Sequence, residues 1–387
     1  MSVDKNREFT GLILVSGVDE PGITSKVLSK LAEFSVQIID IKQIVTADRL
    51  LQTILINLLP DHALAVESDL LELANNSSFD VAIDFSQHPN NQEQLEHAYI
   101  SMVDLHLDPK KIATVARYIY QIKANILDIK LNRLSDLNAI TFQIGKTGLN
   151  HIELQDQLKE IGLAEGIDLC LTTQLFQKVK KLFVFDMDST LIKEEVIDLL
   201  AVKANKGEEV SKITAMAMNG ELDFEQSLRQ RVALLAGLPE SVLKETTDLL
   251  NFNSGVIETL KYIKEMGHKV AVVSGGFTQV IEKFLAQVEV DYVFANTLDI
   301  ANSTLTGKLT GEIIDGSGKA ESMRKAAQLE SIPLSNTIAI GDGANDLKMM
   351  AAAGYSFAYL AKEVVRQGAK STISQSDMRA LPLLLNL

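Results

Sequence analysis

Acidic side chains stand directly after apolar runs in the second half of the chain. Asp186 and Asp188 follow the run Leu182–Phe185, and Asp342 follows a later run of the same kind. Carboxylate oxygens in such positions suit Mg²⁺, which prefers a few carboxylates together with water and phosphate oxygens. An Asp-x-Asp taken alone is common and fits a solvated turn equally well, so the interpretation depends on partners elsewhere in the chain.

Groups suited to an anion occur in the same half of the sequence. Ser274 and Gly275 come after the apolar segment 268–273, and glycine there lets backbone N–H groups approach an anion closely. Lys319 opens a predicted helix, and Asn345 lies in a later Gly-rich turn. The hydroxyl, the N–H groups and the lysine suit phosphate oxygens. Together with the acids, this set indicates metal-assisted chemistry on a phosphorylated compound.

Three apolar segments must bring these groups together. Residues 182–185, 268–273 and 337–340 are typical of buried strands, and amphipathic helices separate them. Apolar strands that alternate with helices predict a parallel sheet covered on both faces, with ligands at the carboxyl ends of the strands. The acids and Ser274 fall at those ends, so we expect an α/β fold with its site at that edge.

In order and spacing, these four motifs resemble those of the haloacid dehalogenase superfamily of phosphotransferases. The resemblance implies a Rossmann-like parallel sheet. It also implies that Asp186 is the nucleophile that forms an aspartyl-phosphate, and that Asp188 is the general acid and then the base. Mg²⁺ would be held by Asp186, the backbone carbonyl of Asp188 and Asp342. Asp346 is interpreted as an acid that orients Lys319 or a metal-bound water.

Residues 192–265 are predicted to form a small helical cap. Arg231 lies seven residues after Phe224, about 20° away around a helix, so it shares the apolar stripe and needs an anionic partner. Arg229 points elsewhere and is expected to be a solvated surface charge. Arg231 and Glu195 could hold the carboxylate and ammonium groups of an amino acid. The alternative is an ion pair between Arg231 and a glutamate inside the cap.

Four strings within residues 182–385 resemble the phosphoserine phosphatase family: DMDSTLIKEEVID, DFEQSLRQRV, VVSGGF and GDGANDLKMM. The resemblance implies hydrolysis of O-phospho-L-serine to L-serine and phosphate, the last step of serine biosynthesis. Met218 and Phe224 match cap residues that close over the substrate. The positions that match residues binding the substrate and its phosphate are Glu195, Arg231, Ser274, Gly275, Lys319 and Asn345.

Two other functions stay open on the sequence alone. A related phosphatase acting on a sugar phosphate would leave the Arg231 and Glu195 pair without a purpose, because sugars lack carboxylate and ammonium groups. An amino-acid-sensing regulator with a relic catalytic domain is a second alternative. The intact acids Asp186, Asp188 and Asp342 argue against that regulator.

The first half of the chain contains a repeat. Pro109 lies 88 residues after Pro21, and at the same offset the triplet Asp-Ile-Lys occurs at 40–42 and again at 128–130. In each copy the pattern predicts a short strand, a turn with Asp and Pro, an amphipathic helix and two further strands, with another strand suggested at 79–85.

This repeat resembles the ACT domain, a ferredoxin-like module that binds amino acids and pairs side by side with another copy. The turn at Asp19–Gly22 carries the resemblance, since a turn at a helix N-terminus offers free N–H groups to a carboxylate. It implies an amino-acid effector there and a homodimer paired through these modules. The second copy departs from the pattern, with Lys110 and Lys111 in the corresponding turn. Alternatively, both copies only hold subunits together.

We therefore expect three domains. Residues 1–90 and 91–175 would be two ferredoxin-like α+β ACT modules. Residues 176–387 would form the haloacid dehalogenase-type α/β domain, with the small helical cap at about 192–265.

The composition limits the partners. Among 387 residues, 51 acidic and 37 basic side chains give a formal net charge of −14, which argues against nucleic-acid binding. The single cysteine, Cys170, excludes an internal disulfide and a cysteine zinc cluster. The N-terminal residues are charged, and no run approaches the roughly 18 apolar residues of a membrane span. We expect a cytoplasmic protein that binds neither nucleic acid nor membrane.

Overall fold

The computed structural model describes residues 7–89, 97–145, 150–218 and 221–387. The chain divides into two compact units, Met1–Gln94 and Leu95–Leu387. The three-domain boundaries expected at residues 90 and 175 stay a prediction.

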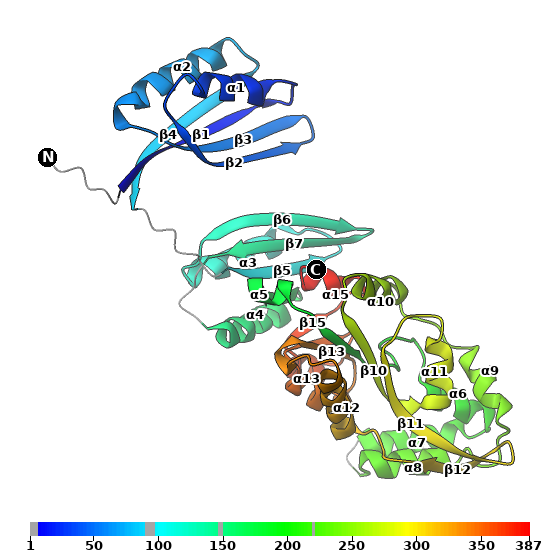
Figure 1. The fold of residues 1–387 in the computed structure, drawn as a ribbon. Helices are drawn as coiled ribbons and strands as arrows, with labels where there is room; N and C mark the ends of the chain where they lie inside the picture. The colour runs from blue at the N-terminus through cyan, green and yellow to red at the C-terminus, as the bar shows by residue number, and fades with distance from the viewer. Residues whose placement is uncertain (1–6, 90–96, 146–149, 219–220) are drawn as a thin grey trace. The chain divides into compact units, whose positions relative to one another are not determined.

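The first unit is a four-stranded antiparallel sheet with two helices on one face (Figure 1). Alternate residues of its central strands, such as Ile13 and Ile54, are buried against Val27 and Val66 of the helices. The strands lie in the order β2-β3-β1-β4. The elements are β1 (Arg7–Val18), α1 (Ile23–Leu31), β2 (Gln37–Thr46), β3 (Arg49–Asn57), α2 (Ala63–Asn75) and β4 (Phe79–Pro89).

The predicted order of strand, helix and two strands is confirmed here, and the strand suggested at 79–85 is part of β4. Helix α2 is an element beyond those predicted from the sequence. Its buried residues Ala63, Val66 and Leu70 nevertheless have the three- and four-residue spacing of an amphipathic helix. The helix completes a βαββαβ module.

The second unit begins with a module of the same design. Its strands lie in the order β6-β7-β5-β8, which matches the order in the first unit element by element. In both modules the edge strand has an irregularity at the corresponding position, between Ile38 and Asp40 and between Ile126 and Asp128. The elements are β5 (Ala98–Asp104), α3 (Pro109–Gln121), β6 (Ile126–Leu134), β7 (Leu137–Ile144), α4 (His151–Glu165) and β8 (Asp168–Thr173).

The helix-free face of this second module is covered by the rest of its unit. Val103 and Cys170 belong to the same buried cluster as Leu381 and Leu384 of helix α15 (Ala380–Leu384). Figure 1 shows α15, in red, against this module. The buried Asp168 also accepts hydrogen bonds from Thr372 Oγ1 (2.9 Å) and from Ser374 N (2.8 Å) and Oγ (2.9 Å). The module and the following domain therefore share one core.

The larger part of the second unit contains a seven-stranded sheet in the order β12-β11-β10-β9-β13-β14-β15. All neighbouring strands are parallel except β11 and β12. This confirms the predicted α/β fold, and it places β10, β9 and β13 side by side at the centre. The strands are β9 (Leu182–Phe185), β10 (Lys269–Phe277), β11 (Tyr292–Ala301), β12 (Thr304–Thr310), β13 (Thr337–Gly341), β14 (Tyr355–Tyr359) and β15 (Ser371–Ile373).

Helix α5 (Gln174–Lys178) precedes the first of these strands, and the other helices lie between the strands and cover the sheet. Their buried residues, such as Leu260 of α10 and Met323 of α12, pack on the apolar faces of the central strands. The helices are α5 (Gln174–Lys178), α10 (Val256–Glu265), α11 (Thr278–Leu285), α12 (Gly316–Leu329), α13 (Leu347–Ala352) and α14 (Glu363–Gly368).

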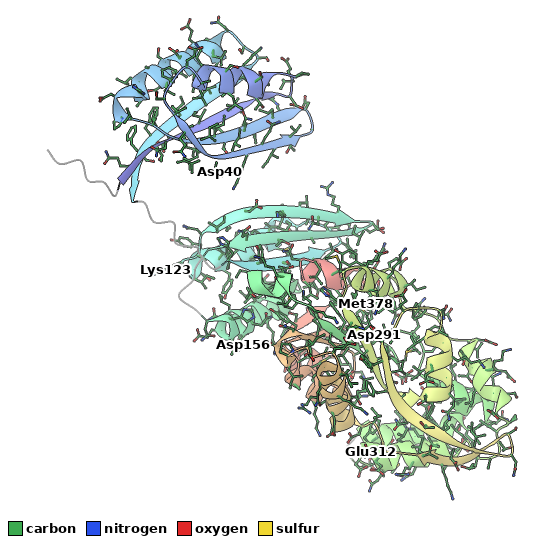
Figure 2. The ribbon with its side chains drawn as sticks, in the orientation of Figure 1. Asp40, Lys123, Asp156, Asp291, Glu312 and Met378 are labelled. Atoms are coloured by element: carbon green, nitrogen blue, oxygen red, sulfur yellow. The ribbon has the colours of Figure 1, made fainter. Side chains whose placement is uncertain are left out.

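The amino ends of the strands are closed by ion pairs. Asp291, labelled in Figure 2, immediately precedes β11, and its carboxylate accepts from Lys264 of α10 at 2.6 Å and from Lys269 of β10 at 2.9 Å. Its second oxygen also accepts from the backbone N–H of Val270. These contacts join α10, β10 and β11 at one edge of the sheet. The functional groups predicted from the sequence lie at the other, carboxyl edge.

Four helices between β9 and α10 form the cap: α6 (Val196–Lys203), α7 (Gly207–Met218), α8 (Phe224–Ala233) and α9 (Ser241–Thr247). Asp223 starts α8 by accepting from Gln226 N at 2.7 Å, an arrangement that satisfies free N–H groups of the first turn. The predicted stripe is buried at Leu228 and Val232. Arg229 is exposed as expected and pairs with Glu225 at 2.7 Å.

No helix in the described part of the chain combines the length and the apolar character needed to cross a membrane.

Candidate active site

Asp186 lies at the end of β9, at the carboxyl edge of the sheet. Its backbone N–H donates to Ile340 O of the neighbouring strand at 2.8 Å, which fixes the residue against β13. Its carboxylate oxygen Oδ1 accepts from Met187 N at 2.8 Å and from Lys319 Nζ at 2.6 Å. With 4% of its surface exposed, the side chain is buried at the bottom of a cavity.

Lys319 is fully buried in the first turn of α12, although lysine is rarely buried without partners. Asp315 caps this helix by accepting from Ser317 N at 2.9 Å and Gly318 N at 2.7 Å. The ammonium group contacts Asp186 Oδ1 at 2.6 Å and Asp346 Oδ1 at 2.7 Å. Burial alone would lower the pKa of Lys319, but the carboxylates of Asp186 and Asp346 outweigh it and raise that pKa, so the lysine is a fixed positive charge.

Burial raises the pKa values of Asp186, Asp188 and Asp342 above their ordinary range. Burial, and next the carboxylate of Glu195, raise the pKa of Asp188 to about 8. Burial, followed by the charge of Asp346, raises the pKa of Asp342 to about 6. Burial and Asp346 also raise the pKa of Asp186, while Lys319 opposes the shift. A protonated Asp188 near neutral pH is suited to donating a proton.

The carboxylates also fit a metal ion. Oxygens of Asp186, Asp342 and Asp346 lie within 4.8 Å of one another. Asp346 already accepts from Lys319 Nζ at Oδ1 and from Gly343 N at Oδ2, whereas no described residue donates to Asp186 Oδ2. Asp186 and Asp342 therefore have more free oxygen surface for a metal than Asp346, and hard oxygen donors of this kind suit Mg²⁺.

A cavity of about 190 Å³ opens above these acids. In the last part of β10, Ser274 Oγ accepts from Gly276 N at 2.8 Å and Asn296 Nδ2 donates to Gly275 O at 2.9 Å, where the register of the strand shifts beside the cavity. The residues that line the cavity are Asp186, Asp188, Glu195, Ile197, Phe224, Leu228, Arg231, Gly275, Gly276, Asp342, Gly343 and Asn345.

The structure thus brings together all the site residues that the sequence predicts. Ser274 and Lys319 are buried behind the wall, and each contacts a lining residue, Gly276 and Asp186 respectively. The side chain of Met218, expected to close over a substrate, lies outside the described side chains, whereas Phe224 lines the cavity.

The cap contributes a cation and an acid to the wall. Arg231 Nε donates to Ser227 O at 3.4 Å, and no described carboxylate lies within 4.0 Å of the guanidinium group. The ion pair considered as an alternative is therefore absent from the described residues. Glu195, at the start of α6, faces the same cavity and accepts from Ser189 Oγ at 2.9 Å. Burial lowers the pKa of Arg231, while the acids around it, first Asp198 and then Glu195, oppose the shift.

Two further residues of the site escape the sequence analysis. Thr190 is buried and donates from Oγ1 to Asp342 Oδ1 at 3.2 Å. Ser189 has a positive φ of 57° and holds Glu195 through its hydroxyl group. Their place directly after the acid pair is the only signal of these roles in the sequence.

Comparison with known proteins shows which families the chain resembles. A family model for haloacid dehalogenase-like hydrolases matches residues 183–351, and an ACT domain model matches residues 10–85. The prediction of two ACT domains is therefore confirmed by a family match for the first module only.

Similar proteins include a "Phosphoserine phosphatase" of Streptomyces coelicolor, 36% identical over 98% of this chain and 92% of that protein. Among solved structures, a HAD family hydrolase from Salmonella enterica serovar Typhi is 29% identical with a TM-score of 0.65, covering 75% of this chain and 98% of that one. A structure titled "Phospho-Aspartyl Intermediate Analogue of Phosphoserine phosphatase" is 43% identical with a TM-score of 0.50, covering 53% of this chain and 98% of that one.

Proposed function

Because the chain belongs to the phosphoserine phosphatase family of haloacid dehalogenase-like hydrolases, we propose that it hydrolyses O-phospho-L-serine to L-serine and phosphate with Mg²⁺ as its cofactor. The observation that carries the proposal is the guanidinium group of Arg231. It lines the same cavity as Glu195 and Asp186, and it has no carboxylate partner among the described residues.

An α-amino acid needs a cation for its carboxylate and an acid for its ammonium group. Arg231 can grip a carboxylate through two parallel hydrogen bonds, and Glu195 is already oriented by Ser189 to receive an ammonium group. Phe224 and Leu228 cover the space between them with apolar surface. A phosphate group on the same molecule would then reach Asp186, Gly275 and Asn345.

In the proposed reaction, a carboxylate oxygen of Asp186 attacks phosphorus and the ester bond to the serine oxygen breaks. Asp188 gives its proton to that leaving oxygen, a role that suits its raised pKa. Asp188 then accepts a proton from the water that attacks the aspartyl-phosphate, which releases phosphate and restores Asp186. The solved relative titled as a phospho-aspartyl intermediate analogue supports this assignment by analogy.

Charge neutralisation is the other requirement, since a carboxylate must approach a phosphate dianion. Asp186, Asp342 and the backbone carbonyl of Asp188 would hold Mg²⁺, which supplies positive charge to the phosphate when bound. Lys319 contributes a second, permanent charge, because Asp186 and Asp346 hold it in place. Ser274 and the N–H groups near Gly275 would receive the remaining phosphate oxygens.

The direct test is phosphate release from L-phosphoserine, with and without Mg²⁺, beside a sugar phosphate and an aryl phosphate. We expect strong Mg²⁺-dependent preference for phosphoserine, and loss of activity when the metal is chelated. Activity only on the other two phosphates would keep the reaction and overturn the substrate. A sugar phosphatase is the second candidate, but it leaves Arg231 and Glu195 without ligands to bind.

The first module supports a regulatory part of the proposal, in which an amino acid binds near Asp19–Gly22. Helix α1 begins after Gly22, whose φ of 96° favours glycine, and no side chain caps its free N–H groups. The helix end would receive the carboxylate of the amino acid.

Calorimetry of the full chain with L-serine and other amino acids tests this regulatory site. The protein used carries Arg231→Ala, which removes the expected serine site of the cavity. Any heat of binding would then come from the first module. We expect heat of binding with at least one amino acid. No heat with any amino acid would refute the site.

The second module has the same topology without a matching turn. Lys111, in the position of Ile23, donates to Asp104 Oδ2 at 2.7 Å. We infer that this module is a diverged ACT copy. The side chain of Lys111 fills the space at its turn, so the module binds no effector there. Pairing of two chains through the first modules, as a homodimer, belongs to the same proposal.

A further inference from the structure

The cap is joined to the core by two segments, residues 189–195 leading out and residues 249–255 leading back. Lys193 N donates to Asn251 O at 3.0 Å and Asn253 N donates to Leu191 O at 2.9 Å, with Ile192 opposite Phe252 as an antiparallel pair. The two segments therefore form a short paired stem at the edge of the active site.

Asn253 crosses this stem with its side chain. Its amide Nδ2 donates to Thr190 O at 2.9 Å and to Ile192 O at 3.0 Å, and a longer contact of 3.4 Å reaches Ser189 O. An amide nitrogen has two N–H groups, so the first two contacts are the principal hydrogen bonds. One half-buried side chain thus fixes the backbone that immediately follows the acid pair.

Ser189 and Thr190, whose carbonyl groups Asn253 holds, each orient one carboxylate of the site. The hydroxyl of Thr190 donates to Asp342 on the metal side, at 3.2 Å. The hydroxyl of Ser189 donates to Glu195 on the cap side, at 2.9 Å. Ser189 also has a positive φ, a strained conformation that persists only where the surroundings enforce it.

From this arrangement we infer that Asn253 is a positioning residue. It fixes the orientation of two carboxylates at once, that of Asp342 in the metal site and that of Glu195 in the serine site. This inference rests on the proposed function for the identity of the ligands. Asn253 touches neither reacting group. It acts through the backbone of Ser189 and Thr190. Its loss therefore weakens both metal binding and phosphoserine binding, which otherwise depend on different residues.

The test compares Asn253→Asp, which keeps the shape but removes the N–H donors, and Asn253→Ala with the wild type. We expect kcat/KM for phosphoserine to fall about tenfold, as expected for buried acceptors that lose their donor, and the affinity for Mn²⁺, measured by electron paramagnetic resonance, to fall severalfold. Asn251→Ala is the matched control. Asn251 lies on the same segment but contacts Glu194 instead, at 2.9 Å, and its variant should keep both values.

Two further variants each remove one of the two hydroxyl contacts, and so distinguish a positioning role of Asn253 from a general loss of folding. Ser189→Ala should raise KM for phosphoserine and spare Mn²⁺ binding, whereas Thr190→Val should weaken Mn²⁺ binding and spare that KM. Unchanged Mn²⁺ affinity in both Asn253 variants, or losses of equal size in Asn251→Ala, would overturn the inference. If the wild type fails to use phosphoserine, the proposed function falls. The Mn²⁺ measurements and an aryl phosphate then still decide the role of Asn253.

Discussion

Replacing Asp186 by Asn is expected to lower phosphoserine hydrolysis roughly a thousandfold or more, because the carboxylate that attacks phosphorus is lost. Asn keeps the size of the side chain and can still accept from Met187 N, so the fold should persist. The measurement is single-turnover phosphate release, with circular dichroism to compare the folds.

Asp315→Asn is the matched control for this change. It alters an aspartate at the start of the helix that carries Lys319, and asparagine caps helices as well as aspartate does. This variant should retain near wild-type activity. Retention of more than a few percent of the rate in Asp186→Asn would refute the assignment of Asp186 as nucleophile.

Replacing Arg231 by Ala is expected to lower kcat/KM for phosphoserine about 10- to 100-fold, since a charge-assisted hydrogen bond contributes about 1.5–3 kcal/mol. The same variant should hydrolyse an aryl phosphate nearly as well as the wild type, because that substrate has no carboxylate. Steady-state kinetics on both substrates give the ratio directly.

Arg229→Ala separates the role of Arg231 from the loss of any charge on α8. Arg229 lies two positions earlier, is exposed and pairs with Glu225 at 2.7 Å, so its removal should leave both rates unchanged. Equal losses on both substrates in Arg231→Ala would assign that residue a structural role.

The parts of the site that the sequence predicts are those that a local pattern encodes. Asp186, Ser274 and Asp342 each follow an apolar strand, and parallel strands bring their carboxyl ends to one edge. The position of Arg231 also follows from local geometry, since seven residues make nearly two helical turns.

Contacts made through the backbone leave no such pattern. Asn253 holds carbonyl groups more than sixty residues earlier in the chain, and any residue type presents the same carbonyl. Its role becomes visible only when the stem is formed. Thr190 is different, because it lies beside the acid pair, but no local pattern indicates that its hydroxyl donates to Asp342, which follows strand β13.

The sequence of the second module likewise does not indicate which elements cover the two faces of its sheet. Alternating residues of β5 and β7 indicate a sheet with two apolar faces. They do not show that one face packs on helices α3 and α4 and the other on α15. That pairing joins segments far apart in the chain, which periodicity does not report.

The position of α15 also has a consequence for synthesis. The ribosome makes β8 about 200 residues before α15, so at roughly 5–20 residues per second the face around Val103 and Cys170 waits on the order of 10–40 seconds for its cover. During that interval the nascent chain presents an apolar sheet surface to its surroundings. The second module therefore cannot bury this sheet face when its own residues have been made. It can do so only once helix α15 has been translated.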